Sequence, residues 1–183
     1  MIALIVLVVM TLAAVALVRS VDTTNQIAGN MSFREGAVHS GERSTELAIN
    51  EWIARYSGKD PATGKPYSKL WNDEPLQGYY AARKDPSATQ SWDTFWAELG
   101  PKTVAADAAG NQVSYVIHRL CEFKDKAPHE ANCSKPPAAA SSGGSFSAGA
   151  VSTITSDQVY YRVTTRVVGP RNTVAYIQTI VAQ

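Results

Sequence analysis

The chain opens with an uninterrupted apolar run. Residues 1–18 contain one hydroxyl, Thr11, and no charge before Arg19. At ~1.5 Å rise per residue the run would extend roughly 27 Å as a helix, close to the ~30 Å hydrocarbon core of a bilayer. A secretory signal normally carries Lys or Arg before its apolar stretch and a small-residue cleavage site after it. Only Met1 precedes this run, so the pattern favours a membrane helix over a cleaved signal.

A helical pattern continues beyond the apolar run. From Arg19 to Tyr56 there is no proline, and apolar residues recur mostly at spacings of three, four or seven: Ile27, Met31, Val38, Leu47, Ile49, Trp52, Ile53 and Tyr56. Ser57-Gly58 followed by Pro61 stops the helix, because glycine accepts the left-handed conformation and proline cannot extend a helix. We therefore predict one helix over residues 1–57, with 1–18 as its membrane or filament-core part and an apolar stripe that needs a partner.

The remaining residues, 58–183, are enough for one globular domain. The sequence predicts a loop-rich connection over residues 58–110 and a sheet over residues 111–183. QVSYVIHRLCEF and QVYYRVTTRVV have strand character, and Gly169-Pro170-Arg171-Asn172 is a turn before the partner strand TVAYIQTIVA. We expect three or four antiparallel strands whose inner face packs on the outer half of the long helix. That arrangement is an α+β fold.

One short helix is predicted inside the loop region. In SWDTFWAELGP, Ser91 caps the helix and Gly100-Pro101 ends it. The apolar face consists of Trp92, Phe95, Trp96 and Leu99. Such a stripe is interpreted as core rather than as an aromatic patch that binds a ligand.

Charge and composition change this picture little. There are 17 Lys and Arg against 16 Asp and Glu, a formal charge of +1, which gives no bulk attraction for nucleic acid. Residues 124–157 are dominated by Lys, Pro, Ala, Ser and Gly, which predicts a mobile excursion.

The segment after the apolar run has a distinctive sequence. VRSVDTTNQIAGNMSFREGAVHSGERSTELAINEW places an Ala28-Gly29-Asn30 step at a characteristic distance from the run. It resembles the N-terminal region of PilX-type minor pilins of type IV pili. The ending VYYRVTTRVVGPRNTVAYIQTIV is similar, more loosely, to the C-terminal hairpin of that family. The resemblance implies a type IV pilin-like fold, with these residues of the helix taking part in membrane insertion and assembly: Met1, Ile5, Val18, Arg19, Asp22, Ala28, Gly29 and Asn30.

The same resemblance implies a function. A minor pilin is a structural subunit that helps initiate a type IV pilus or cap its tip, and so supports adhesion and twitching motility. Its partners would be other minor pilins, the major pilin and a tip adhesin. It would sit in the inner membrane with a periplasmic domain before assembly, and in the extracellular pilus afterwards.

Two N-terminal residues have specific meaning under this resemblance. A prepilin peptidase removes a basic leader from pilins, so Met1 is expected to be the first residue of the mature chain. Major pilins carry a glutamate at the fifth mature position, which pairs with the amine of a neighbouring subunit. Ile5 cannot do so. Because an unpaired buried ammonium is costly, we expect a position at the pilus tip or in its initiation complex.

Cys121 and Cys133 are the only cysteines. An exported domain lies in an oxidising compartment, so a disulfide between them is the preferred interpretation. The alternative is a zinc site that adds His118 and His129, although the spacing fits no zinc motif and His118 and Cys121 would lie on opposite faces of a strand. We therefore expect no metal and no other cofactor.

Other chemistry has little support in the sequence. It contains no phosphate-binding glycine loop, nucleophile elbow or HExxH, and no acid pair in a recognisable setting, so we expect no enzymatic activity. Arg162, Arg166 and Arg171 could touch DNA, but three arginines are more typical of a solvated face. The alternatives to a minor pilin are a membrane-anchored, adhesin-like binding module and a type II secretion pseudopilin.

Overall fold

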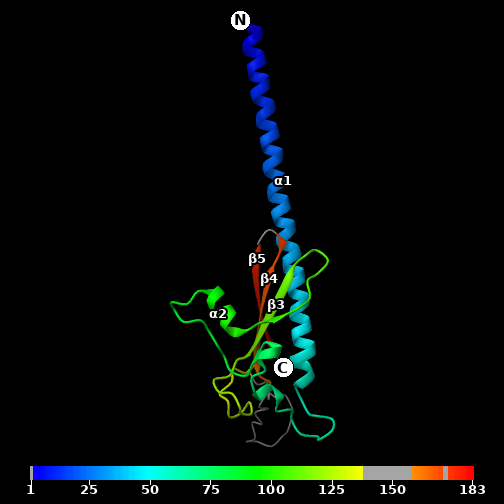
Figure 1. Cartoon of the computed structure of the whole chain (residues 1–183), viewed down its shortest axis with the longest axis vertical. Coiled ribbons are helices and arrows are strands. Elements are labelled where there is room, and N and C mark those ends of the chain that lie inside the picture. The colour runs from blue at the N-terminus through cyan, green and yellow to red at the C-terminus, as the bar shows by residue number, and fades with distance from the viewer. Residues whose placement is uncertain (1, 138–157, 171–172) are drawn as a thin grey trace, which may run out of the picture.

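A long helix projects from a small domain. The computed structural model describes residues 2–137, 158–170 and 173–183, so Met1, Arg171 and most of the predicted excursion lie outside the described residues. Helix α1 (Ile2–Ala48) continues without a break into the π-helical segment η1 (Ile49–Ala54). Its N-terminal end lies far from the domain, and its other end lies against the sheet (Figure 1). The predicted long helix and its packing on a sheet are confirmed.

Three long antiparallel strands form the sheet. They are β3 (Gln112–Arg119), β4 (Tyr160–Val168) and β5 (Val174–Ala182). In the register, Val163 of β4 lies between Ile117 of β3 and Thr179 of β5. The β-branched and aromatic content of β3, the alternation along β4 and the turn before β5 predicted these strands.

Two short strands make the sheet larger than expected. β1 (Tyr79–Tyr80) pairs with β3 in parallel, and β2 (Lys102–Thr103) pairs with β3 antiparallel. The part of the chain that the structure describes therefore contains a mixed sheet of five strands, and the prediction of three or four purely antiparallel strands was too narrow. Both additional strands come from the predicted loop region, where two-residue strands have no detectable alternation.

Three short helices lie in the same connection: the 3₁₀ segments η2 (Lys69–Trp71) and η3 (Pro75–Gln77), and α2 (Trp92–Leu99). The Ser91 hydroxyl caps α2 by accepting a bond from the Thr94 amide, and Gly100 ends it with a φ of 57°. Phe95, Trp96 and Leu99 are buried as expected, but the fourth member of the predicted face, Trp92, is 48% exposed.

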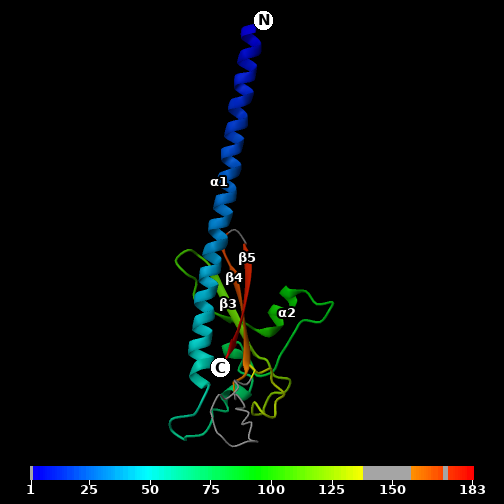
Figure 2. The same cartoon turned by 180° about the vertical axis from the view of Figure 1, so that it is seen from behind.

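The core has two layers, one on each face of the sheet. On one face, Ile117 and Val163 pack with Ala48 and Ile53 of the long helix. On the other, Val116 and Tyr80 pack with Phe95, Trp96 and Leu99. The views from opposite sides agree that α1 and α2 lie on different sides of the sheet (Figure 2).

Small residues of α1 make the closest contact with the sheet. The buried residues of α1 are Ala37, Gly41, Ser44, Thr45 and Ala48. A Cβ atom added at Gly41 would lie 2.3 Å from Ile177 Cδ1, so glycine permits this close approach. The predicted apolar stripe is divided between two environments. Trp52 and Ile53 pack in the core of the domain, whereas Ile27 and Met31 are 55% and 67% exposed and lie before the buried stretch, so the described domain is not the partner of these two residues.

Candidate functional site

The first part of α1 is exposed on all sides. Its apolar side chains have no cover from the described part of the domain, and Ile5 and Val18 are each 61% exposed. The helix is long and apolar enough to cross a membrane. Arg19 and Asp22 are the first charged residues along it. The segment therefore needs an apolar environment that the described domain does not supply.

The residues of the predicted assembly step lie on this projecting part. Ala28 and Asn30 are exposed, and Gly29 is half-buried. A Cβ atom at Gly29 would meet nothing within 4 Å. The Ala28-Gly29-Asn30 segment therefore lies on the uncovered part of the helix. Among the described residues, no packing contact requires a glycine at position 29. Met1, the remaining residue of the predicted set, lies outside the described residues.

The exposed helix carries a seam that the sequence analysis did not identify. Leu17, Val21, Thr24, Ala28 and Met31 follow one another at intervals of four, three, four and three residues. Such intervals place side chains on one side of a helix and are typical of the seam between packed helices. All five side chains are exposed. The seam begins in the membrane-length segment and continues past its first charges.

A polar cluster fixes the helix to the domain where the exposed part ends. Ser40 donates a hydrogen bond to Asp107, in the loop between β2 and β3, and Asn111 Nδ2 donates to the same carboxylate at 2.9 Å. These bonds lower the pKa of Asp107 to about 2. One helical turn further, Thr45 Oγ1 lies 3.0 Å from Thr165 Oγ1 of β4. The helix therefore has a fixed direction relative to the sheet.

The predicted disulfide is present. Cys121 and Cys133 are bonded to each other, so neither is available as a thiolate ligand for zinc. The two histidines of the alternative zinc site differ in solvent exposure. His118 is 1% exposed, whereas the His129 side chain is 72% exposed. In the ranges that the structure describes, no group of three or more potential metal ligands is found.

A buried arginine organises the disulfide loop. Arg119 is 0% exposed. Its Nε donates to Cys121 Sγ at 2.9 Å, and its Nη atoms donate to the carbonyl oxygens of Leu70 at 3.1 Å and Lys126 at 3.0 Å. Burial lowers the pKa of Arg119. The guanidinium thus ties the loop, the sheet and η2 together through backbone carbonyls.

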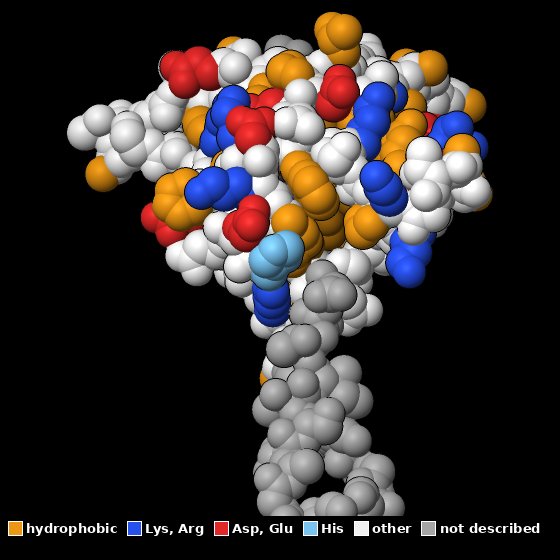
Figure 3. Space-filling model, turned by 90° about the horizontal axis from the view of Figure 1, so that it is seen from below, with side chains coloured by type: hydrophobic (Ala, Val, Ile, Leu, Met, Phe, Trp, Pro, Cys, Tyr) orange, Lys and Arg blue, Asp and Glu red, His pale blue; other side chains and the backbone are white. Residues whose placement is uncertain are grey.

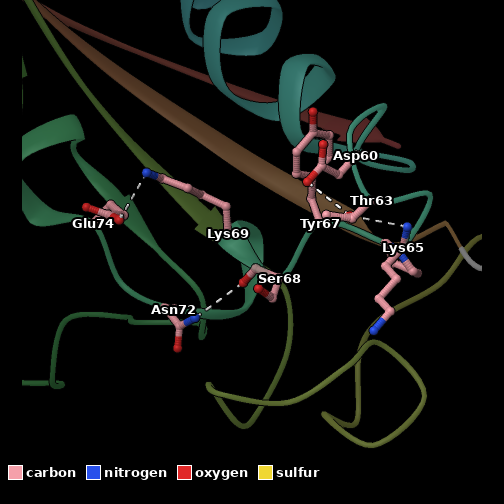
Figure 4. A pocket seen from close by; sticks show the side chains of 9 residues that line it. Asp60, Thr63, Lys65, Tyr67, Ser68, Lys69, Asn72 and Glu74 are labelled. Carbon is pink, nitrogen blue, oxygen red and sulfur yellow. Dashed lines mark hydrogen bonds and ion pairs between the residues drawn. The ribbon is translucent and has the colours of Figure 1, made fainter.

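A depression of about 520 Å³ lies at the loop after the long helix (Figure 4). Its polar side chains largely contact each other: Lys69 Nζ lies 3.7 Å from Glu74 Oε1, and Thr63 Oγ1 donates to Asp60 Oδ2 at 3.1 Å. A ligand would have to compete with these pairs. We therefore assign no function to this depression.

The end of the domain farthest from the N-terminus is not a uniformly basic surface. There, acidic, basic and hydrophobic side chains are interspersed among the described residues (Figure 3). Arg162 Nη1 lies 2.6 Å from Asp85 Oδ1, and Arg166 Nε donates to the Tyr176 hydroxyl at 3.1 Å. These two arginines are thus engaged within the domain, which gives no support to contact with DNA.

No protein-family model, curated protein or solved structure matches this chain.

Proposed function

We propose that this protein is a PilX-like minor pilin, a structural subunit that helps initiate assembly of a type IV pilus or caps its tip. One observation carries the proposal. The exposed apolar surface of α1 extends beyond the part that a bilayer would cover, along the seam that ends at Met31. The resemblance of the Ala28-Gly29-Asn30 region to PilX-type pilins supports the same conclusion.

A membrane anchor alone would not account for this surface. An anchor needs apolar side chains only up to the first charges, Arg19 and Asp22. Val21, Ile27 and Met31 are 53%, 55% and 67% exposed and are located at or beyond that boundary. Full burial of such a side chain contributes about 1.5–3 kcal/mol. Packing against the helices of other pilins would bury these side chains and gain this free energy. In an isolated anchored domain they would stay exposed.

The charge pattern of the helix favours a terminal position in the filament. Ile2–Val21 contains Arg19 but no carboxylate. Another subunit whose N-terminal amine became buried against this stretch would find no counter-charge there, at a cost of several kcal/mol. A subunit at the tip does not have to provide a counter-charge, because no neighbouring subunit's amine is buried against it. Before assembly the helix would hold the protein in the inner membrane.

The seam provides the test. We propose to compare Ala28→Glu with Gln26→Glu, two exposed positions in the same turn on opposite sides of the helix. Both changes add one negative charge. In native cells, both variants should reach the membrane in wild-type amounts, because neither position contacts the domain. Ala28→Glu should reduce recovery of the protein in sheared extracellular filaments at least about tenfold, because a carboxylate would be buried between helices.

Gln26→Glu should leave that recovery unchanged. Equal recovery of both variants in the filament fraction would contradict the proposed seam. Absence of the wild-type protein from that fraction, with all of it in membranes, would favour an anchored binding module over a pilin.

A further inference from the structure

A shallow groove lies on the sheet face that α2 covers only in part. α2 packs over Val116 of β3 and Tyr80 of β1. Beyond the helix, the same face continues across β4 and β5, on the side of the sheet opposite α1 (Figures 1 and 2). Two depressions of about 310 and 550 Å³ share the Tyr176 side chain in their lining. The Tyr176 side chain therefore lines both depressions, which together make up the groove.

Two aromatic rings line the groove, Tyr176 in both depressions and Trp92 in the smaller one. Trp92 is 48% exposed and Tyr176 is 40% exposed, with ring centroids 5.9 Å apart. Each ring is held by a buried neighbour in an edge contact: Trp92 by Phe95 at 5.8 Å, and Tyr176 by Trp96 at 5.7 Å. The rings are thus fixed in place while much of their surface faces solvent.

Polar side chains border both rings. Arg166 Nε donates to the Tyr176 hydroxyl at 3.1 Å, and that hydroxyl donates to Asp93 Oδ1 at 3.2 Å. Burial raises the pKa of Tyr176, so its hydroxyl keeps its proton at neutral pH. On the other side of the ring, Gln178 Nε2 donates to Thr164 Oγ1 at 3.1 Å.

These groups retain capacity to bind a ligand. A guanidinium has five N–H donors, and its contact with Tyr176 uses one. The side-chain oxygens of Asp93 and Gln178 each have two lone pairs. Asp93 and Arg166 carry opposite charges, so the groove is nearly neutral overall.

We propose that this groove binds a neutral oligosaccharide. The less polar face of a pyranose ring presents C–H bonds, whose partial positive charge is attracted to the negative face of an aromatic ring. Its hydroxyl groups both donate and accept, and so match the amide, carboxylate and guanidinium at the rim. A lipid chain would cover the remaining donors and acceptors of these groups without pairing them, at a cost. Asp93 and Arg166 border the same ring with opposite charges, so neither an anion nor a cation has a net electrostatic advantage there over a neutral ligand.

The test uses the full chain in a detergent without a sugar headgroup. Cellopentaose, maltopentaose and N-acetylchitopentaose are titrated while tryptophan fluorescence is recorded. At least one of them should bind and change the emission. Trp92→Ala should weaken that binding at least tenfold, and Tyr176→Ala likewise. Because these changes could affect packing, Tyr176→Phe is included. It keeps the ring and removes only the hydroxyl, so it should weaken binding less than Tyr176→Ala.

Phe123→Ala is the matched control, because Phe123 is an aromatic residue 46% exposed at a distant loop. It should bind the sugar like the wild type. The proposal is wrong if none of the three sugars binds at millimolar concentration, or if Phe123→Ala and Trp92→Ala weaken binding equally. It is also wrong if no sugar binds and Trp92→Ala instead lowers the mass of an oligomer in solution, because the groove would then be a contact between copies of the chain. None of these results depends on pilus assembly.

Discussion

His118 is a buried histidine whose ring nitrogens have no hydrogen-bond partner among the described residues. Its ring stacks on Tyr80, with centroids 5.5 Å apart. Burial, followed by the positive charge of Arg162, lowers its pKa from 6.5 to about 3. Lys84 lowers the pKa further, and Asp85 and Asp73 raise it. The folded domain therefore keeps His118 neutral in mildly acidic solution, where an unfolded chain would protonate it.

This difference predicts a loss of stability in acid. The unfolded chain binds a proton at His118 as pH falls below about 6.5 and the folded chain does not until about 3, so the free energy of unfolding falls through that window. The slope contributed by His118 is at most about 1.4 kcal/mol per pH unit. Urea unfolding of the full chain in detergent at pH 6.5, 5.5 and 4.5 measures it.

Substitution variants identify the residue responsible for the slope. His118→Phe should flatten it, because the aromatic ring remains and the titrating group is removed. His129→Gln, at an exposed position, should leave it unchanged. An undiminished slope in His118→Phe would show that another group causes the acid sensitivity. Asp107, with a pKa of about 2, loses its contribution to stability only at lower pH and so does not interfere.

Among the contacts between α1 and the sheet, one close approach requires a glycine. The backbone of α1 approaches β4 and β5 at Gly41, where a Cβ atom would be 2.3 Å from Ile177 Cδ1 and 3.1 Å from Val167 Cγ2. At Gly36, one and a half turns earlier, a Cβ atom would meet nothing within 4 Å. The two glycines are therefore in different environments within one helix.

Leucine substitutions should separate these environments. Gly41→Leu should lower the free energy of unfolding by about 2 kcal/mol, because overpacking outweighs the gain of about 1 kcal/mol in helix propensity. Gly36→Leu should raise it by up to about 1 kcal/mol. Urea unfolding of the full chain in detergent measures both. Equal effects of the two substitutions would mean that the helix is not seated closely at Gly41.

Elements with a long periodic pattern could be predicted from sequence, and short ones could not. The apolar run and the alternation in QVYYRVTTRVV predicted α1 and β4, because each pattern spans many residues. β1 and β2 have two residues each and exist only because β3 offers a free edge. The π-helical turn at Ile49–Ala54 leaves no periodic signal either.

The seam and the groove also differ in how far the sequence could predict them. The seam of α1 is a local pattern and can be read from the sequence once helical spacing is counted. The groove combines Trp92 of α2 with Tyr176 of β5, which are distant in sequence. The exposure of Trp92 depends on how far α2 extends over the sheet, so the prediction that its whole stripe is core was wrong for this residue. The disulfide was predictable because only two cysteines exist.

For the whole molecule, the division between a covered and an uncovered length of helix is the main feature. The second part of α1 shares the core of the domain, and the polar cluster at Ser40 and Asp107 holds its direction. The first part projects without contact to the described domain and presents the seam, whose side chains are apolar except for Thr24. If the protein is a minor pilin as proposed, this arrangement would allow the helix to move from a membrane into a bundle of helices while the domain stays folded.

Immunogold labelling of sheared filaments, with an antibody against the globular domain, would locate the protein within the filament. If the protein is a minor pilin of the kind proposed, gold particles should mark one end of the filaments. Regular labelling along the shaft would contradict the terminal position. Unlabelled filaments, with all of the protein retained in membranes, would contradict its incorporation into a pilus.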